Sequence, residues 1–130
     1  MSAAERIPLA RPTLGEREEE LVLEVLRSGM LSLGPKLGEF EGAFARRVGV
    51  DQDLVSAVSS GTAALHLAVR EQGWGPGDRV ITTPLTFVAS ANCLLFEGAE
   101  PVFCDVDPAT LTLDPAAAAS APAEGVAGIL

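Results

Sequence analysis

The stretch that decides the fold is residues 79–105, RVITTPLTFVASANCLLFEGAEPVFCD. It opens with a short apolar run, continues with an apolar segment of helix length that a glycine closes, and ends with a second short apolar run. We therefore expect a strand over residues 79–83, a helix over 86–96 and a strand over 101–105. This order is typical of a unit in which two parallel strands flank a helix.

The flanking segments extend this alternation. Upstream, residues 54–58 predict a short strand, and an almost wholly apolar helix follows from about residue 62. Downstream, the Asp-Pro-Ala sequence at 114–116 predicts a small helix, and residues 126–130 predict the start of another strand. The whole pattern predicts an α/β fold of three layers, with a mainly parallel sheet between helices.

The first fifty residues predict helices only. Residues 13–16, TLGE, have the form of a capping box and predict a helix that ends near residue 29. Gly34-Pro35 predicts the start of a second helix, and Gly49 predicts its end. We expect a helical segment over about 14–49, before the strands and helices alternate.

The last predicted strand bears on the extent of the protein. If the sheet ended at residues 126–130, hydrogen-bonding groups and apolar surface would stay uncovered. We therefore expect residues 1–130 to be the incomplete N-terminal part of one larger domain.

Composition excludes several classes of protein. The formal net charge is −9 and the sequence has no Lys/Arg cluster, which argues against a nucleic-acid partner. There is neither an apolar signal core in residues 1–12 nor an apolar run long enough to span a membrane. Cys93 and Cys104 sit in apolar runs and the chain has one histidine, so we expect buried thiols, no metal site and a cytoplasmic location.

Residues 59–68, SSGTAALHLA, join the predicted strand to the apolar helix. The unpaired N–H groups of a first helical turn, with the positive end of the helix dipole behind them, suit a phosphate group. Gly61 would allow close approach of the backbone, and the Thr62 hydroxyl would add a donor. The alternative is that Ser59 or Ser60 only caps the helix, and the decapeptide taken alone favours the cap.

Phe87 follows a strand end, at the edge of the sheet where open α/β folds bind ligands. Its ring could stack on an aromatic cofactor. The alternative is a core phenylalanine, which is our interpretation of the other four: Phe40, Phe44, Phe96 and Phe103.

Three further polar residues receive structural interpretations. His66 lies one turn into the apolar helix, so we interpret it as a hydrogen-bonded structural histidine rather than a general base. Asp105 and Asp107 lie at a strand end beside a proline. We interpret them as loop and capping residues, with a place in the lining of a site as the alternative.

Three segments in order resemble a known family: GPKLGEFEGAFA at 34–45, SSGTAALHLAV at 59–69 and GPGDRVITTPLTFVASANCLLFEGAEPVFCDVDPATLTLDP at 75–115. They resemble the DegT/StrS-type sugar-nucleotide aminotransferases, which are pyridoxal 5′-phosphate (PLP) enzymes of fold type I. The resemblance runs from about Ile7 to the last residue and covers about the first third of such an enzyme. It implies a homodimer whose active sites lie at the dimer interface.

The resemblance also implies roles for single residues. Gly61, Thr62 and Ala63 would hold the cofactor phosphate together with Ser60, and Phe87 would stack on the pyridine ring. The segment that contains Ser32 and Gly34 would lie near the active site, which makes these two residues candidates for substrate binding.

The family needs a lysine that forms a Schiff base with PLP and an acidic partner for the pyridine nitrogen. The only lysine is Lys36, at the start of an amphipathic helix, and both catalytic groups are expected beyond residue 130. We therefore expect the chain as given to bind the cofactor, to contain no catalytic residue and to have no activity of its own.

The parent enzyme would move an amino group from an amino acid, with glutamate as the expected donor, to a keto-sugar nucleotide. Two alternatives stay open from the sequence. One is a PLP-dependent sugar dehydratase, in which histidine replaces the lysine. The other is a non-enzymatic α/β module that binds a phosphorylated ligand.

Overall fold

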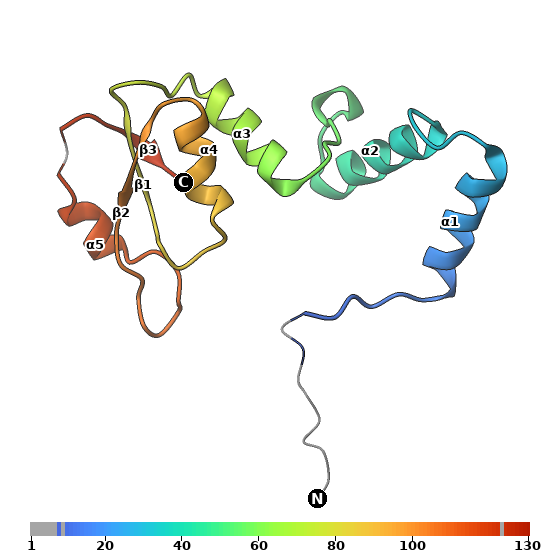
Figure 1. Cartoon of the computed structure of the whole chain (residues 1–130), viewed down its shortest axis with the longest axis horizontal. Coiled ribbons are helices and arrows are strands. Elements are labelled where there is room, and N and C mark those ends of the chain that lie inside the picture. The colour runs from blue at the N-terminus through green and yellow to red at the C-terminus, as the bar shows by residue number, and fades with distance from the viewer. Residues whose placement is uncertain (1–7, 9, 123) are drawn as a thin grey trace, which may run out of the picture. The chain divides into compact units, whose positions relative to one another are not determined.

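The computed structural model of the protein describes residues 8, 10–122 and 124–130 (Figure 1). The chain divides into two compact units, unit 1 over Met1–Ala57 and unit 2 over Val58–Leu130. Ile7, where the resemblance begins, and most of the segment searched for a signal core lie outside the described residues.

Unit 1 contains two α-helices and a 3₁₀ turn: α1 (Glu16–Ser28), α2 (Pro35–Val48) and η1 (Gln52–Leu54). Both helices end as predicted, because Gly29 and Gly49 adopt the left-handed conformation with φ of 71° and 77°. Pro35 occupies the first turn of α2, where its missing N–H removes no helical hydrogen bond.

The capping box predicted at Thr13 is wrong. Helix α1 begins at Glu16 and its N-cap is Gly15, whose N–H donates to Oε2 of Glu18 at 2.7 Å. The reaching carboxylate of a capping box lies three residues beyond the cap, and both Thr13–Glu16 and Gly15–Glu18 have this spacing, so the spacing alone could not select the cap. Because glycine has no side chain, only one of the two reciprocal hydrogen bonds forms.

The strand predicted at residues 54–58 is also wrong. Residues 52–54 form η1, and the segment that follows pairs with no strand in the described part of the chain. Instead, the N–H of Ala57 donates to Oε1 of Glu41, on α2, at 2.9 Å. The carboxylate of Glu41 thus accepts the hydrogen bond that a carbonyl of a neighbouring strand would accept, and residues 55–58 stay unpaired in the described part of the chain.

Unit 2 is built on a parallel sheet of three strands in the order β2-β1-β3. The strands are β1 (Arg79–Thr82), β2 (Glu100–Phe103) and β3 (Val126–Ile129). Both pairs of neighbours are parallel, with an irregularity in the β1–β3 register between Arg79 and Val80. The predicted α/β fold with a mainly parallel sheet is therefore confirmed.

Three helices accompany the sheet: α3 (Gly61–Glu71), α4 (Ala89–Phe96) and α5 (Pro115–Ser120). Helix α3 packs on α4, and α4 packs on β1 and β2. Figure 1 shows α4 and α5 on opposite sides of the strands, which gives the three layers that the sequence predicts.

Helix α4 begins at Ala89, three residues later than the sequence predicts. The preceding segment forms turns instead, in which the N–H of Leu85 donates to Oγ1 of Thr83 at 3.1 Å. The hydroxyls of Thr86 and Ser90 lie 3.3 Å apart across the start of the helix.

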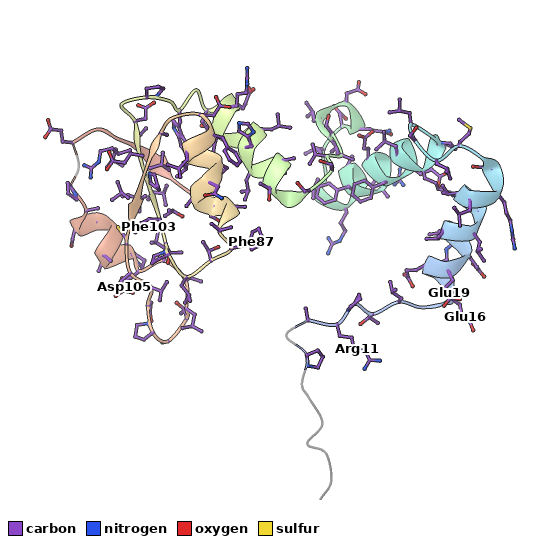
Figure 2. The ribbon with its side chains drawn as sticks, viewed as in Figure 1. Arg11, Glu16, Glu19, Phe87, Phe103 and Asp105 are labelled. Carbon is purple, nitrogen blue, oxygen red and sulfur yellow. The ribbon has the colours of Figure 1, made fainter. Side chains whose placement is uncertain are left out.

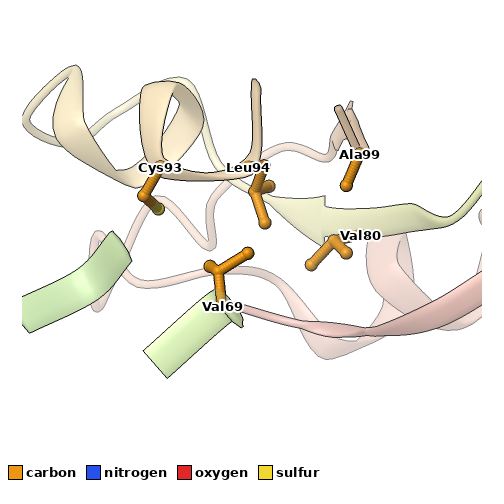
Figure 3. Close-up of a cluster of buried hydrophobic side chains, with 5 residues drawn as sticks. All are labelled: Val69, Val80, Cys93, Leu94 and Ala99. Carbon is orange, nitrogen blue, oxygen red and sulfur yellow. The ribbon is translucent and has the colours of Figure 1, made fainter. Parts of the chain in front are cut away.

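The core of unit 2 lies between α3, α4 and the sheet. Its buried side chains are Val69, Val80, Cys93, Leu94 and Ala99 (Figure 3). Cys93 and Cys104 are both buried free thiols, as predicted. Burial raises the pKa of Cys93, which keeps its thiol protonated at neutral pH.

The assignment of four phenylalanines to the core is wrong. Their exposed fractions are 56% for Phe40, 49% for Phe44, 56% for Phe96 and 54% for Phe103. Helical or strand periodicity places an apolar side chain on one face but does not supply the element that covers that face. Within the described part of unit 1, only Gly42 and Ala45 are buried.

Candidate cofactor-binding site

The start of α3 has a complete N-cap. Oγ of Ser60 accepts a hydrogen bond from the N–H of Ala63 at 3.1 Å. The carbonyl of Ser60 accepts another from the N–H of Ala64, also at 3.1 Å. Of the two serines offered by the sequence, Ser60 is therefore the cap, and its hydroxyl is engaged with the backbone.

The cap leaves two donors of the first turn free. In the part of the chain that the structure describes, the N–H groups of Gly61 and Thr62 have no acceptor. A Cβ added at Gly61 would meet no atom within 4 Å, so the space beside this backbone is open. Two unengaged donors at the positive end of a helix, beside open space, fit the chemistry of a phosphate group.

This site differs in one respect from the site that the sequence predicts. Because residues 55–58 form no strand, the donors of the site come from α3 alone and not from a strand-to-helix junction. The Thr62 side chain, which is half-buried, remains available as an additional donor.

Phe87 lies in the loop between β1 and α4, where Figure 2 shows its side chain. Its ring is 74% exposed, which rules out the core alternative within unit 2. The carbonyl of Phe87 accepts the N–H of Ser90 at 3.0 Å, so the first turn of α4 holds the backbone of this residue. An exposed ring on a fixed backbone can stack on a planar ligand.

The fold places these two features toward the same edge of the sheet. Helix α3 leads into the start of β1, and α4 follows the end of β1, so both helices begin toward the carboxyl edge of the strands (Figure 1). The two helices also pack on each other. The unengaged donors of α3 and the ring of Phe87 therefore lie toward the edge at which open α/β sheets bind ligands.

His66 is hydrogen-bonded, as predicted, but its partner is a residue that the sequence did not point to. Nε2 of His66 donates to Oε1 of Glu97 at 2.6 Å, since a carboxylate accepts. Nη1 of Arg70 lies 3.8 Å from the same oxygen. Glu97 follows His66 by 31 residues, and no local spacing in the sequence links the two.

Asp105 and Asp107 lie in the loop after β2, which confirms the loop part of their interpretation, and neither of them caps a described helix. Oδ1 of Asp105 accepts the N–H of Val106 at 2.8 Å, and Oδ1 of Asp107 accepts the N–H of Ala109 at 2.7 Å. Figure 2 shows Asp105 just beyond Phe103, the last residue of β2.

The two candidate substrate-binding residues belong to unit 1. Ser32 is exposed in the loop between α1 and α2, and Gly34 is the N-cap of α2. Both line a hollow of about 170 Å³ whose lining also includes Lys36. The structure thus brings Ser32, Gly34 and Lys36 together.

Lys36 has the surroundings of a structural ion pair. Its Nζ lies 2.9 Å from Oε2 of Glu39 and 3.2 Å from Oε1 of Glu24. Hydrogen bonds to Glu39 first, and then to Glu24, raise the pKa of Lys36 above its ordinary value. A Schiff-base lysine needs a lowered pKa, so these contacts oppose such a role.

Two other kinds of site are absent from residues 8, 10–122 and 124–130. These residues contain no group of three or more His, Cys, Asp or Glu side chains that could hold a metal ion. No helix among them is both long and apolar enough to cross a bilayer.

The fold and the site define a class: an open parallel α/β unit with two unengaged backbone N–H groups at a helix start and an exposed ring on the next loop. Residues 12–130 match the DegT/DnrJ/EryC1/StrS aminotransferase family. The chain therefore belongs to this family, which depends on PLP in general.

Relatives of this chain include sugar aminotransferases. The spore coat polysaccharide biosynthesis protein SpsC of Bacillus subtilis is 50% identical over 109 residues, which are 84% of this chain and 28% of SpsC. A dTDP-4-dehydro-2,3,6-trideoxy-D-glucose 4-aminotransferase of Saccharopolyspora spinosa is 48% identical over 119 residues, 90% of this chain and 31% of that enzyme.

A solved structure of an aminotransferase also resembles this chain. The crystal structure of the aminotransferase TlmJ from Streptoalloteichus hindustanus matches with a TM-score of 0.83 and 42% sequence identity. The match covers 93% of this chain and 33% of TlmJ. The chain thus spans about a third of the length of the proteins that it resembles.

Proposed function

We propose that this chain provides the phosphate- and ring-binding part of a PLP-dependent aminotransferase that acts on a keto-sugar nucleotide. The observation that carries the proposal is the pair of unengaged N–H groups at Gly61 and Thr62, beside open space, in a chain of this family. PLP, when bound, supplies the electron sink for amino-group transfer. Residues 1–130 would form the first part of its cofactor domain, with the helical segment over about 14–49.

The residues of this chain would bind and orient the cofactor. The N–H groups of Gly61 and Thr62, with the Thr62 hydroxyl, would donate to phosphate oxygens, while Ser60 and Ala63 keep the first turn of α3 in place through their hydrogen bond. Phe87 would pack against the face of the pyridine ring. Ser32 and Gly34 would contact the sugar nucleotide.

We extend the proposal to the assembled enzyme. It would be a cytoplasmic homodimer that takes the amino group from an amino acid, with glutamate as donor. The Schiff-base lysine and the acidic partner of the pyridine nitrogen would lie outside this chain, so the chain alone would bind the cofactor without transferring an amino group. A sugar dehydratase relative and a non-enzymatic phosphate-binding module would share this cofactor site, and no observation in the structure favours either of them.

Pyridoxamine 5′-phosphate provides the cleanest test, because its amine forms no Schiff base with Lys36. We expect calorimetric titration to show binding, and pyridoxamine without the phosphate to bind at least about tenfold more weakly. Gly61→Ala should weaken binding of the phosphorylated probe by about tenfold, because its methyl group fills the open space beside the donors. Phe87→Leu should weaken both probes by about fivefold.

The matched control is Gly38→Ala, in α2. Its added Cβ would meet only Nε2 of Gln52, at 3.9 Å, so it changes a helical glycine outside the proposed site. The proposal fails if the wild-type chain does not bind the phosphorylated probe, or if Gly61→Ala and Gly38→Ala bind it equally well.

A further inference from the structure

Helices α3 and α4 share a polar contact that is not part of the apolar core between them. Nε2 of His66, in α3, donates to Oε1 of Glu97, the C-cap of α4, at 2.6 Å. The imidazole also meets the ring of Phe96 edge-on, with centroids 5.2 Å apart. The side chains of His66 and Glu97 are 36% and 22% exposed, so both are partly withdrawn from water.

The two helices carry the two parts of the proposed cofactor site. Helix α3 begins at Gly61, about one and a half turns before His66, and its first turn holds the unengaged donors. Helix α4 follows the loop that carries Phe87, and Glu97 closes its other end. A shift of α3 along α4 would therefore move the phosphate donors relative to the stacking ring.

The apolar contacts between the helices do not by themselves prevent such a shift. Val69 on α3 packs against Cys93 and Leu94 on α4 (Figure 3), and apolar attraction has no preferred direction. A hydrogen bond of 2.6 Å has a narrow range of distance and angle, so it selects one register of the two helices. Charge assistance from the carboxylate strengthens this selection.

Arg70 does not replace His66 in this role. Its Nη1 is 3.8 Å from the Glu97 oxygen, beyond hydrogen-bond distance, and its side chain is 72% exposed. Solvent screens an ion pair of this kind, and such pairs contribute little.

We propose that His66 and Glu97 form a positioning pair, which holds the phosphate donors of α3 in register with the ring of Phe87. This inference rests on the proposed function, because it assigns the pair to the same cofactor. Neither residue would touch the cofactor. Their effect on binding passes through the positions of the two helices.

The test compares His66→Leu with His66→Gln in the full chain. Leucine keeps the apolar contact with Phe96 but donates no hydrogen bond, whereas the glutamine amide can donate from about the position of Nε2. Glu100→Gln is the matched control, because it removes a carboxylate from unit 2, at β2, that faces Arg79 and not α3. All variants are measured well below their unfolding temperatures, so that a loss of stability does not change the measured affinity.

Two readouts separate this inference from the proposed function. In the ligand-free chain, we expect His66→Leu to move the backbone amide resonances of Gly61 and Phe87, while His66→Gln and Glu100→Gln leave them near the wild-type positions. With pyridoxamine 5′-phosphate, His66→Leu should weaken binding by about fivefold or more, and His66→Gln should restore most of it.

The possible outcomes are distinct. The positioning role is overturned if the two amides do not move in His66→Leu, or if His66→Gln moves them as far as leucine does. It is also overturned if the phosphorylated probe binds to His66→Leu as it does to wild type. If the wild-type chain does not bind the probe at all, the proposed function fails, and the amide resonances alone still decide whether the pair positions the helices.

Discussion

The ring of Trp74 lies directly against the backbone of Gly128, the third residue of β3. A Cβ added at Gly128 would stand 2.3 Å from Cζ2 of Trp74 and 2.9 Å from Cη2. Both distances are shorter than any ordinary contact between carbon atoms, so only glycine allows β3 and this ring to approach so closely. Trp74 also packs against the core of unit 2.

Gly128→Ala should therefore destabilise unit 2. We expect a loss of about 1–3 kcal/mol in the free energy of unfolding, because either the ring or the strand must move. Urea denaturation followed by Trp74 fluorescence measures the change. The control is Gly75→Ala, whose Cβ would lie 3.5 Å from the carbonyl of Glu97, an ordinary contact. Equal stabilities of the two variants would contradict the prediction.

The cap of α3 gives a second prediction. Ser60→Ala removes the acceptor of the Ala63 N–H, and we expect a loss of about 1 kcal/mol in the free energy of unfolding. Ser60→Gly should cost only a few tenths of a kcal/mol, since glycine is itself an acceptable N-cap. Thermal unfolding of the three proteins gives the order. If Ser60→Ala is as stable as wild type, the hydrogen bond between Ser60 and Ala63 makes no net contribution to stability.

A strained loop residue gives a third prediction. Leu111 has a φ of 58° and is 63% exposed, so it adopts the left-handed conformation without the compensation of burial. Leu111→Asn should stabilise unit 2 by about 1 kcal/mol, because asparagine tolerates this conformation better. Leu85→Asn is the control, at an exposed leucine whose φ is not positive. A stabilisation shared by both variants would trace the gain to lower surface hydrophobicity and not to the backbone.

The pKa of Lys36 gives a prediction about pH. Hydrogen bonds to Glu39 and Glu24 raise this pKa above 10.5 in the folded chain. The pairing therefore contributes stability that is fully present below 10.5 and is lost as the pH rises through the folded pKa. We expect Glu24→Gln/Glu39→Gln to be less stable than wild type at neutral pH, and the difference to shrink in strongly alkaline solution.

Urea denaturation at a series of pH values measures this difference. The control is Glu20→Gln, which breaks the exposed pair of Glu20 with Arg17, 3.1 Å apart. Arginine keeps its charge over this range, so the effect of Glu20→Gln should not change with pH. A difference for the double variant that stays constant into strong alkali would argue against Lys36 as its source.

Several local features followed directly from the sequence. Gly29 and Gly49 end their helices because glycine takes the left-handed conformation at no steric cost. Pro35 marks the start of α2 because a helix begins without using its first N–H groups. The strand–helix–strand alternation of residues 79–105 predicted the parallel sheet, because two short apolar runs with one helix between them form parallel neighbouring strands.

The tertiary structure alone decided the remaining features, because each depends on a partner that is distant in sequence. Residues 55–58 are not a strand, since the carboxylate of Glu41 takes the Ala57 N–H. Four phenylalanines predicted as core are half-exposed, because periodicity assigns a face and not its cover.

The candidate site shows the same division. The sequence determined the chemistry at the start of α3, where a serine, a glycine and a threonine in succession supply a cap, open space and donors. Only the folded chain could show that Ser60 is the cap and that Phe87 is exposed. The pairing of His66 with Glu97 also required the packing of α3 on α4, because a hydrogen bond between residues so far apart leaves no local pattern.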